Sequence, residues 1–142
     1  MGVCLGSAIT KRVIFESLTY GVASPEVFMS DTLFSKIIRR EIPADIVFEN
    51  AHVVGFRDLN PQAPVHVLFV PREPVPTLND LRHDQAELAG QLLLAAAHYA
   101  REQGFAEAGY RTVINTNADA GQTVFHIHLH LLAGRTLSWP PG

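Results

Sequence analysis

Two stretches of this sequence repeat apolar residues with the period of an α-helix. The first begins at Thr32 and ends before Pro43, and its apolar face would hold Leu33, Phe34, Ile37 and Ile38. The second begins at Asp84, with Glu87 three residues later as in a capping box, and would run for about twenty residues. Gly104 suits the C-terminal end of that helix. We therefore predict two main helices.

Shorter apolar stretches bounded by turn-forming residues predict strands. They cover residues 46–49, 53–58, 65–70, 111–115 and 124–132. No regular alternation of strands with helices occurs, so we predict an α+β domain. Its five-stranded sheet would be antiparallel, with the helices on one face.

The first thirty residues keep neither a helical nor a strand period. We predict a poorly structured N-terminal extension over residues 1–30 and one folded domain over residues 31–142. A chain of 142 residues is long enough for a single ordinary core.

Histidines alternate with apolar residues in the predicted strand 124–132. Side chains of a strand point to opposite faces in turn, so His126, His128 and His130 should share one open face. Phe125, Ile127, Leu129 and Leu131 should face the core. His66 lies in the strand 65–70 and should share a face with Leu68 and Val70. Several imidazoles on one face suggest a binding site for a polar ligand, since each ring needs polar partners.

Three interpretations of this histidine cluster differ in plausibility. A metal site would want second-shell carboxylates near the three histidines, and none is obvious, so we expect no metal or other cofactor. A solvated polar strand explains three identical alternating residues poorly. Nucleophilic and acid–base catalysis on an anionic substrate fits best, because a neutral imidazole attacks and a protonated one stabilises charge.

Nearby polar residues fit a phosphate group. Asn115 supplies an amide, Gly121 allows close backbone approach and Thr123 supplies a hydroxyl. Asp58 could accept both hydroxyls of a ribose, and it is equally well explained as a turn-forming aspartate.

Composition narrows the range of partners. Only 18% of the residues are charged and the net charge is −3, so we expect neither a nucleic-acid binder nor a protein of anionic membrane surfaces. The longest apolar runs are far shorter than the roughly 18 residues that span a bilayer. A single cysteine, Cys4, fits a reducing compartment, and we expect a cytoplasmic protein.

The segment His-Ile-His-Leu-His-Leu-Leu over residues 126–132 resembles the signature of the histidine triad superfamily, in which three histidines alternate with hydrophobic residues. Within it the chain is similar to the histidine triad nucleotide-binding (Hint) branch. That likeness rests on residues 31–43, on Pro-Gln-Ala-Pro-Val-His at 61–66, and on the ending Trp-Pro-Pro-Gly at 139–142. It covers residues 31–142.

The resemblance implies a homodimer whose two sheets join, and hydrolysis of purine nucleoside phosphoramidates or aminoacyl adenylates. It implies that His128 is the nucleophile that takes the nucleotidyl group, that His130 contacts the phosphate, and that His126 and His66 orient the nucleophile. Phosphate-pocket positions would be Asn115, Gly121 and Thr123, with Asp58 on the ribose. The base pocket would hold Leu33, Phe34, Ile37, Phe56 and Leu59, and Trp139 would influence the choice of leaving group.

Other functions remain open at this level. Thr123 stands where many Hint proteins have serine, so this position does not separate the branch from dinucleoside polyphosphate hydrolases. A nucleotide-binding regulatory module with incidental hydrolysis is the alternative outside the enzymes. The complete third histidine, which nucleotidyl transferases of the superfamily replace, favours water as the acceptor.

Overall fold

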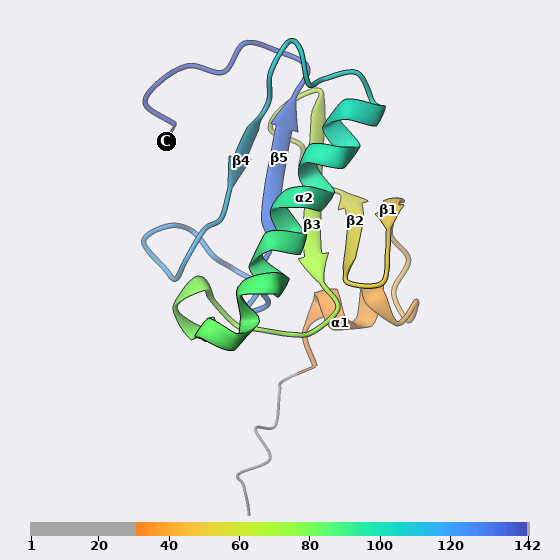
Figure 1. Ribbon diagram of the computed structural model, residues 1–142, viewed down its shortest axis with the longest axis vertical. Helices are drawn as coiled ribbons and strands as arrows, with labels where there is room; N and C mark the ends of the chain where they lie inside the picture. Colours follow the sequence, from red (N-terminus) through yellow and green to blue (C-terminus); the bar gives the residue numbers. More distant parts are fainter. Residues whose placement is uncertain (1–30, 142) are drawn as a thin grey trace, which may run out of the picture.

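The computed structural model describes residues 31–141, so the predicted N-terminal extension lies outside the described residues. Its elements are α1 (Leu33–Ile38), β1 (Ile46–Glu49), β2 (Val53–Arg57), β3 (Val65–Pro71), α2 (Ala86–Glu102), β4 (Arg111–Val113) and β5 (Leu129–Ala133), with 3₁₀ turns at Leu78–Asp80 and His83–Gln85. The five strands form one antiparallel sheet in the order β1-β2-β3-β5-β4 (Figure 1). The predicted α+β architecture is confirmed.

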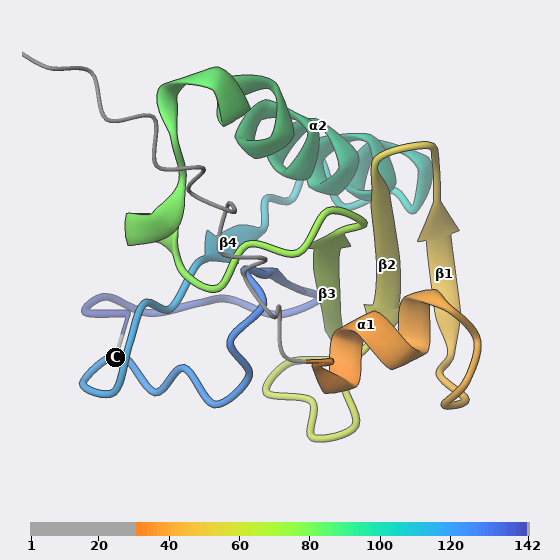
Figure 2. The same ribbon diagram turned by 90° about the horizontal axis from the view of Figure 1, so that it is seen from below.

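The two helices pack on opposite faces of the sheet, which corrects the prediction that they share one face (Figure 2). Residues of β3 alternate between the two sides. Val67 and Phe69 pack in the α2 cluster, whereas Leu68 and Val70 pack with Phe34 of α1. Both faces of β3 are buried, one against each helix. Its sequence is therefore apolar throughout except at His66, instead of alternating between apolar and polar residues.

Helix α2 begins later than predicted. Asp84 does not cap it, because the carboxylate of Asp84 accepts a hydrogen bond from the Arg82 guanidinium at 3.0 Å. The Gln85 side chain instead accepts the backbone N–H of Arg82 at 3.1 Å and closes a 3₁₀ turn. The helix therefore has 17 residues, with Gln85 at its N-terminal boundary.

The predicted strand 124–132 is wrong in its first half, since β5 begins only at Leu129. The preceding residues leave the sheet and bind the last residue of β3 and the segment that follows it. The ring of His126 donates to the Pro71 carbonyl at 2.8 Å, and the N–H of Ile127 donates to the Val75 carbonyl at 2.6 Å. Phe125, predicted to face the core, is consequently half exposed.

Two other predicted strands are shorter in the structure. β2 ends at Arg57, and β4 ends at Val113. In the part of the chain from residue 31 to 141, no helix combines the length and the apolar composition that crossing a membrane requires.

Candidate active site

Within residues 31–141, the ring of His128 forms one hydrogen bond, through Nδ1, and its Nε2 has no partner. Its Nδ1 lies 2.8 Å from the backbone carbonyl oxygen of His126. A carbonyl can only accept, so Nδ1 carries the proton and the lone pair of the neutral ring is on Nε2. Burial lowers the pKa of His128, while the His126 carbonyl and the charge of Asp58 act in the opposite direction. The ring is therefore a neutral imidazole with an available Nε2 lone pair.

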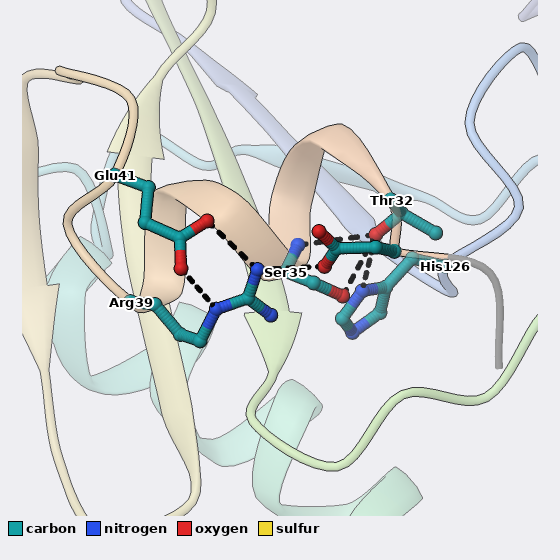
Figure 3. A network of polar contacts seen from close by, with 6 residues as sticks. Thr32, Ser35, Arg39, Glu41 and His126 are labelled. Atoms are coloured by element: carbon teal, nitrogen blue, oxygen red, sulfur yellow. Dashed lines mark hydrogen bonds and ion pairs between the residues drawn. The ribbon is translucent and has the colours of Figure 1, made fainter.

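His126 is fully buried, which contradicts the prediction of an open histidine face. Its Nε2 donates to the Pro71 carbonyl at 2.8 Å, and its Nδ1 lies 3.1 Å from the Thr32 hydroxyl (Figure 3). Burial is the main cause that lowers the pKa of His126, and the neighbouring His128 lowers the pKa further. The hydrogen bond to Pro71 acts in the opposite direction. Both nitrogens of this ring are occupied, so His126 is a structural member of the site.

His66 and His130 face each other across β3 and β5. The backbone N–H of Gln62 donates to Nδ1 of His66 at 3.1 Å, so neutral His66 carries its proton on Nε2. That Nε2 lies 2.9 Å from Nδ1 of His130. His130 thus accepts on Nδ1 and carries its own proton on Nε2. Among the described residues, none bonds this buried Nε2–H, which leaves it for a ligand.

The site strongly disfavours charge on these two rings. The pKa of His130 falls to about 4, chiefly through burial and then through the neighbouring His128 and His66, with Asp58 opposing the shift. Burial also lowers the pKa of His66, again against the effect of Asp58. Near neutral pH both rings are neutral hydrogen-bond donors and acceptors.

Asp58 lies beside this histidine pair. Its Oδ2 is 3.4 Å from Nε2 of His66, and its Oδ1 accepts the backbone N–H of Asn60 at 2.8 Å. The carboxylate thus forms a turn and also faces the site. Asp58, His66 and His130 bring ligand atoms within 4.8 Å of one another and could hold a metal ion. Such an ion would displace the proton that the two histidines share.

A cavity of about 430 Å³ opens beside His66 and His130. Asn115 lines it, as do Leu137, Ser138, Pro140 and Pro141 of the C-terminal segment. Trp139 of the same segment is not among the lining residues, and its side chain is 82% exposed. Gly121 and Thr123, predicted to hold phosphate, are exposed on the preceding loop and are not among the lining residues of this cavity.

Sequence reasoning missed two arginines that also line this cavity. Arg111 donates to the Ser138 carbonyl at 2.7 Å and thereby fastens the C-terminal segment. Arg135 donates at 3.0 Å to the carbonyl of Gln62, the residue whose backbone N–H orients His66. Arg111 is the first residue of β4, and Arg135 lies two residues beyond the end of β5. No sequence pattern distinguishes either one from a surface arginine.

Gln122 was missed as well. Its buried amide donates to the carbonyls of Pro76 at 2.8 Å and Val124 at 3.1 Å, and its Oε1 accepts the N–H of Asn117 at 2.9 Å. These bonds fix the loop that carries Gly121, whose φ of +77° suits glycine. A glutamine within a polar loop gives no sequence pattern from which its burial could be read.

An apolar cluster lies next to the histidines. Phe34, Ile37 and Phe56, three of the five predicted base-pocket residues, are buried together there. The Phe34 ring centroid lies 5.0 Å from that of His128. The other two differ, since Leu33 is half exposed and Leu59 is 99% exposed.

The sequence and the fold of this chain are similar to those of known proteins. The sequence model of the HIT domain family matches residues 39–137. An uncharacterised HIT-like protein of Synechococcus elongatus is 54% identical over 112 residues, which cover 79% of this chain and 97% of that protein. The purine nucleoside phosphoramidase of Escherichia coli K12 is 50% identical over 107 residues, 75% of this chain and 90% of that enzyme. The crystal structure of a HIT family hydrolase from Legionella pneumophila superposes with a TM-score of 0.76 at 49% identity, covering 78% of this chain and 98% of that one. A family match over most of the chain, together with these relatives, makes this protein a member of the HIT domain family.

Proposed function

We propose that this protein hydrolyses purine nucleoside phosphoramidates through a nucleotidyl intermediate on His128. The observation that carries the proposal is the neutral His128 ring, whose Nδ1–H is bound by the His126 carbonyl at 2.8 Å and whose Nε2 keeps its lone pair. The similarity to a purine nucleoside phosphoramidase at 50% identity supports the substrate class.

In the first step, Nε2 of His128 attacks the phosphorus, a P–N bond to the histidine forms, and the P–N bond to the amine breaks. The departing amine needs a proton. The unpartnered Nε2–H of His130 supplies it, while the His66 Nε2–H stays hydrogen-bonded to Nδ1 of His130 at 2.9 Å. The negative charge left on the His130 ring is balanced by the positive charge that the His128 ring gains on forming its bond to phosphorus, with the two ring centroids 4.9 Å apart, until water returns the proton to His130. In the second step, water loses a proton to His130 and attacks the phosphorus, which releases the nucleotide and frees His128.

The apolar cluster of Phe34, Ile37 and Phe56 suits the purine base, since it lies directly beside His128. Asp58 suits the ribose, and Asn115 suits the phosphate or the leaving group from the lining of the cavity. No cofactor enters this mechanism, because the histidines supply both the nucleophile and the proton donor.

We also propose that two copies assemble through β4. This strand lies at one edge of the sheet, and the C-terminal segment with the exposed Trp139 lies beside it (Figure 1). Sedimentation velocity over a range of concentrations tests the proposal. A species of about twice the 15.6 kDa mass is expected, and a monomer at every concentration would contradict it.

The proposed activity is tested by steady-state hydrolysis of adenosine 5′-phosphoramidate in the presence of a chelator. His128→Ala should lose at least about 10³-fold in kcat because it lacks the nucleophile. His98→Ala is the matched control, since His98 is an exposed histidine of α2 bonded to Glu102. It should retain full activity. Diadenosine tetraphosphate, run in parallel, should be the poorer substrate.

Two results would contradict the proposal. Equal activity of the unmodified protein and His128→Ala would remove His128 as the nucleophile. Faster turnover of diadenosine tetraphosphate would replace the phosphoramidate by a dinucleoside polyphosphate as the substrate class.

A further inference from the structure

We infer that Thr32 is a positioning residue for the nucleophile, acting through His126. This inference rests on the proposed function for its consequence in catalysis and on hydrogen-bond chemistry for its geometry. Thr32 lies 94 positions before His126 in the chain, and its Oγ1 is 3.1 Å from Nδ1 of that buried ring. Figure 3 shows the hydroxyl pointing at the imidazole from the start of α1.

The direction of this hydrogen bond follows from the other end of the ring. Nε2 of His126 faces the Pro71 carbonyl at 2.8 Å and must therefore carry the proton. A fully buried, neutral His126 then has only a lone pair on Nδ1. Thr32 has to donate its hydroxyl proton there. Its oxygen remains free to accept the backbone N–H of Ser35 at 3.1 Å, which caps α1.

Three protein groups thus hold His126 in place. The nucleophile, His128, is in turn hydrogen-bonded to the backbone carbonyl of His126. Thr32 and Pro71 bind the two ring nitrogens, and Val75 binds the N–H of the peptide that follows His126. The carbonyl of that same peptide accepts Nδ1–H of His128. Loss of the Thr32 hydroxyl leaves the buried Nδ1 unpaired and frees the ring to tilt, and the carbonyl that aligns His128 tilts with it.

The position of Thr32 is itself fixed from the far end of α1. Arg39, at the end of the helix, donates to Glu41 at 2.7 Å (Figure 3). It also donates to Asp31 at 2.7 Å, so the residue just before Thr32 is tied to the end of the helix. The Ser35 hydroxyl lies 3.0 Å from that of Thr32 and adds a further contact. A hydroxyl held in this way is preorganised toward one partner.

Three variants separate positioning from helix capping. Thr32→Val keeps the shape and removes the hydroxyl, and it should lower kcat for adenosine 5′-phosphoramidate about 10- to 100-fold with little change in KM. Thr32→Ser keeps the hydroxyl and should stay within about threefold of the unmodified protein. Lys36→Gly is the control, because a glycine weakens α1 without touching the bond to His126. Its melting temperature should fall, with kcat unchanged.

Histidine ¹⁵N NMR supplies a readout that is independent of turnover. In the unmodified protein, His126 should be neutral with its proton on Nε2. In Thr32→Asp the carboxylate can cap α1 but can only accept, so His126 should become protonated on both nitrogens and kcat should fall.

The inference is overturned if Thr32→Val loses no more kcat than Lys36→Gly, if Thr32→Ser fails to restore activity, or if Nδ1 of His126 carries the proton in the unmodified protein. If His126 gives the expected NMR signals but the protein does not hydrolyse the phosphoramidate, the proposed function is wrong. The hydrogen bond from Thr32 to His126 would still be supported.

Discussion

At the scale of single residues, backbone groups decide where each histidine carries its proton. The carbonyls of Pro71 and His126 can only accept, and the N–H of Gln62 can only donate. His126 therefore carries its proton on Nε2 and His128 carries its proton on Nδ1, although the two residues are only two positions apart in the chain. Neither tautomer follows from the residue types, because each depends on which main-chain group the fold places against the ring.

The hydrogen bond from His66 to His130 makes a prediction about leaving groups. His66→Asn should lower kcat about 10²-fold for an adenosine phosphoramidate of an aliphatic amine, which leaves only when protonated. The loss should be less than about tenfold for the p-nitrophenyl ester of AMP, whose phenolate leaves without a proton. Both rates come from steady-state assays.

His52→Asn is the control for this comparison, since His52 is an exposed turn residue and should lose nothing on either substrate. Equal losses on the two substrates in His66→Asn would show that His66 does not serve proton delivery.

At the scale of elements, β2 depends on a glycine at its centre. Gly55 pairs with Phe48 of β1 on one side and with Phe69 of β3 on the other. The two phenyl rings meet edge to face over it, with centroids 5.7 Å apart. A Cβ at Gly55 would lie 2.9 Å from the Phe69 ring and 3.0 Å from the Phe48 Cβ. Because Phe69 is fully buried, it has little room to yield.

Gly55→Ala should therefore reduce the free energy of unfolding by about 1–3 kcal/mol through overpacking. Gly90→Ala is the matched substitution in α2, where a Cβ would meet nothing within 4 Å. It should raise the free energy of unfolding by about 0.5–1 kcal/mol through helix propensity. Urea denaturation of the two variants measures both values. Equal signs for the two changes would refute this account of Gly55.

At the scale of the whole molecule, four neutral histidines couple stability to pH. The fold lowers the pKa of His66, His126, His128 and His130, each chiefly through burial. In the unfolded chain a histidine titrates near pH 6.5. Below that value the unfolded state binds more protons than the folded state, so the free energy of unfolding must decrease as the pH falls.

We expect full stability above about pH 6.5 and a progressive loss down to about pH 4, where folded His130 becomes charged. Urea denaturation at successive pH values measures this dependence. His130→Asn should show a shallower fall across the same interval. A free energy of unfolding that stays constant between these limits would contradict the neutral histidine cluster.

Much of the site could be predicted from the sequence because it depends on local pattern. The run His126 to His130 and the separate His66 pointed to histidines that the fold does bring together, and the apolar face of the first helix pointed to Phe34 and Ile37, which lie beside them. His66, Leu68 and Val70 share a face as predicted, because β3 is a continuous strand paired with β2 and β5, in which alternate residues point to the same side.

The same period failed at Phe125 and His126. Alternation within a strand requires that the strand pair with a neighbour. Residues 126–127 bond instead to the carbonyls of Pro71, at the end of β3, and of Val75 beyond it. The prediction that Leu59 lies in the base pocket differs from the structure, in which Leu59 is exposed. The apolar character of a residue does not show whether a turn directs it toward the core.

The sequence by itself determined which residue types make up the candidate site, the antiparallel α+β class and the two helices, because these follow from side-chain chemistry and short-range periodicity. Only the tertiary structure decided that the helices lie on opposite faces, that Thr32 meets His126 and that the Nε2–H of His130 finds no partner among residues 31–141. Those features arise where groups distant in the chain compete for the same donors and acceptors, and that competition is settled only when the core closes around them.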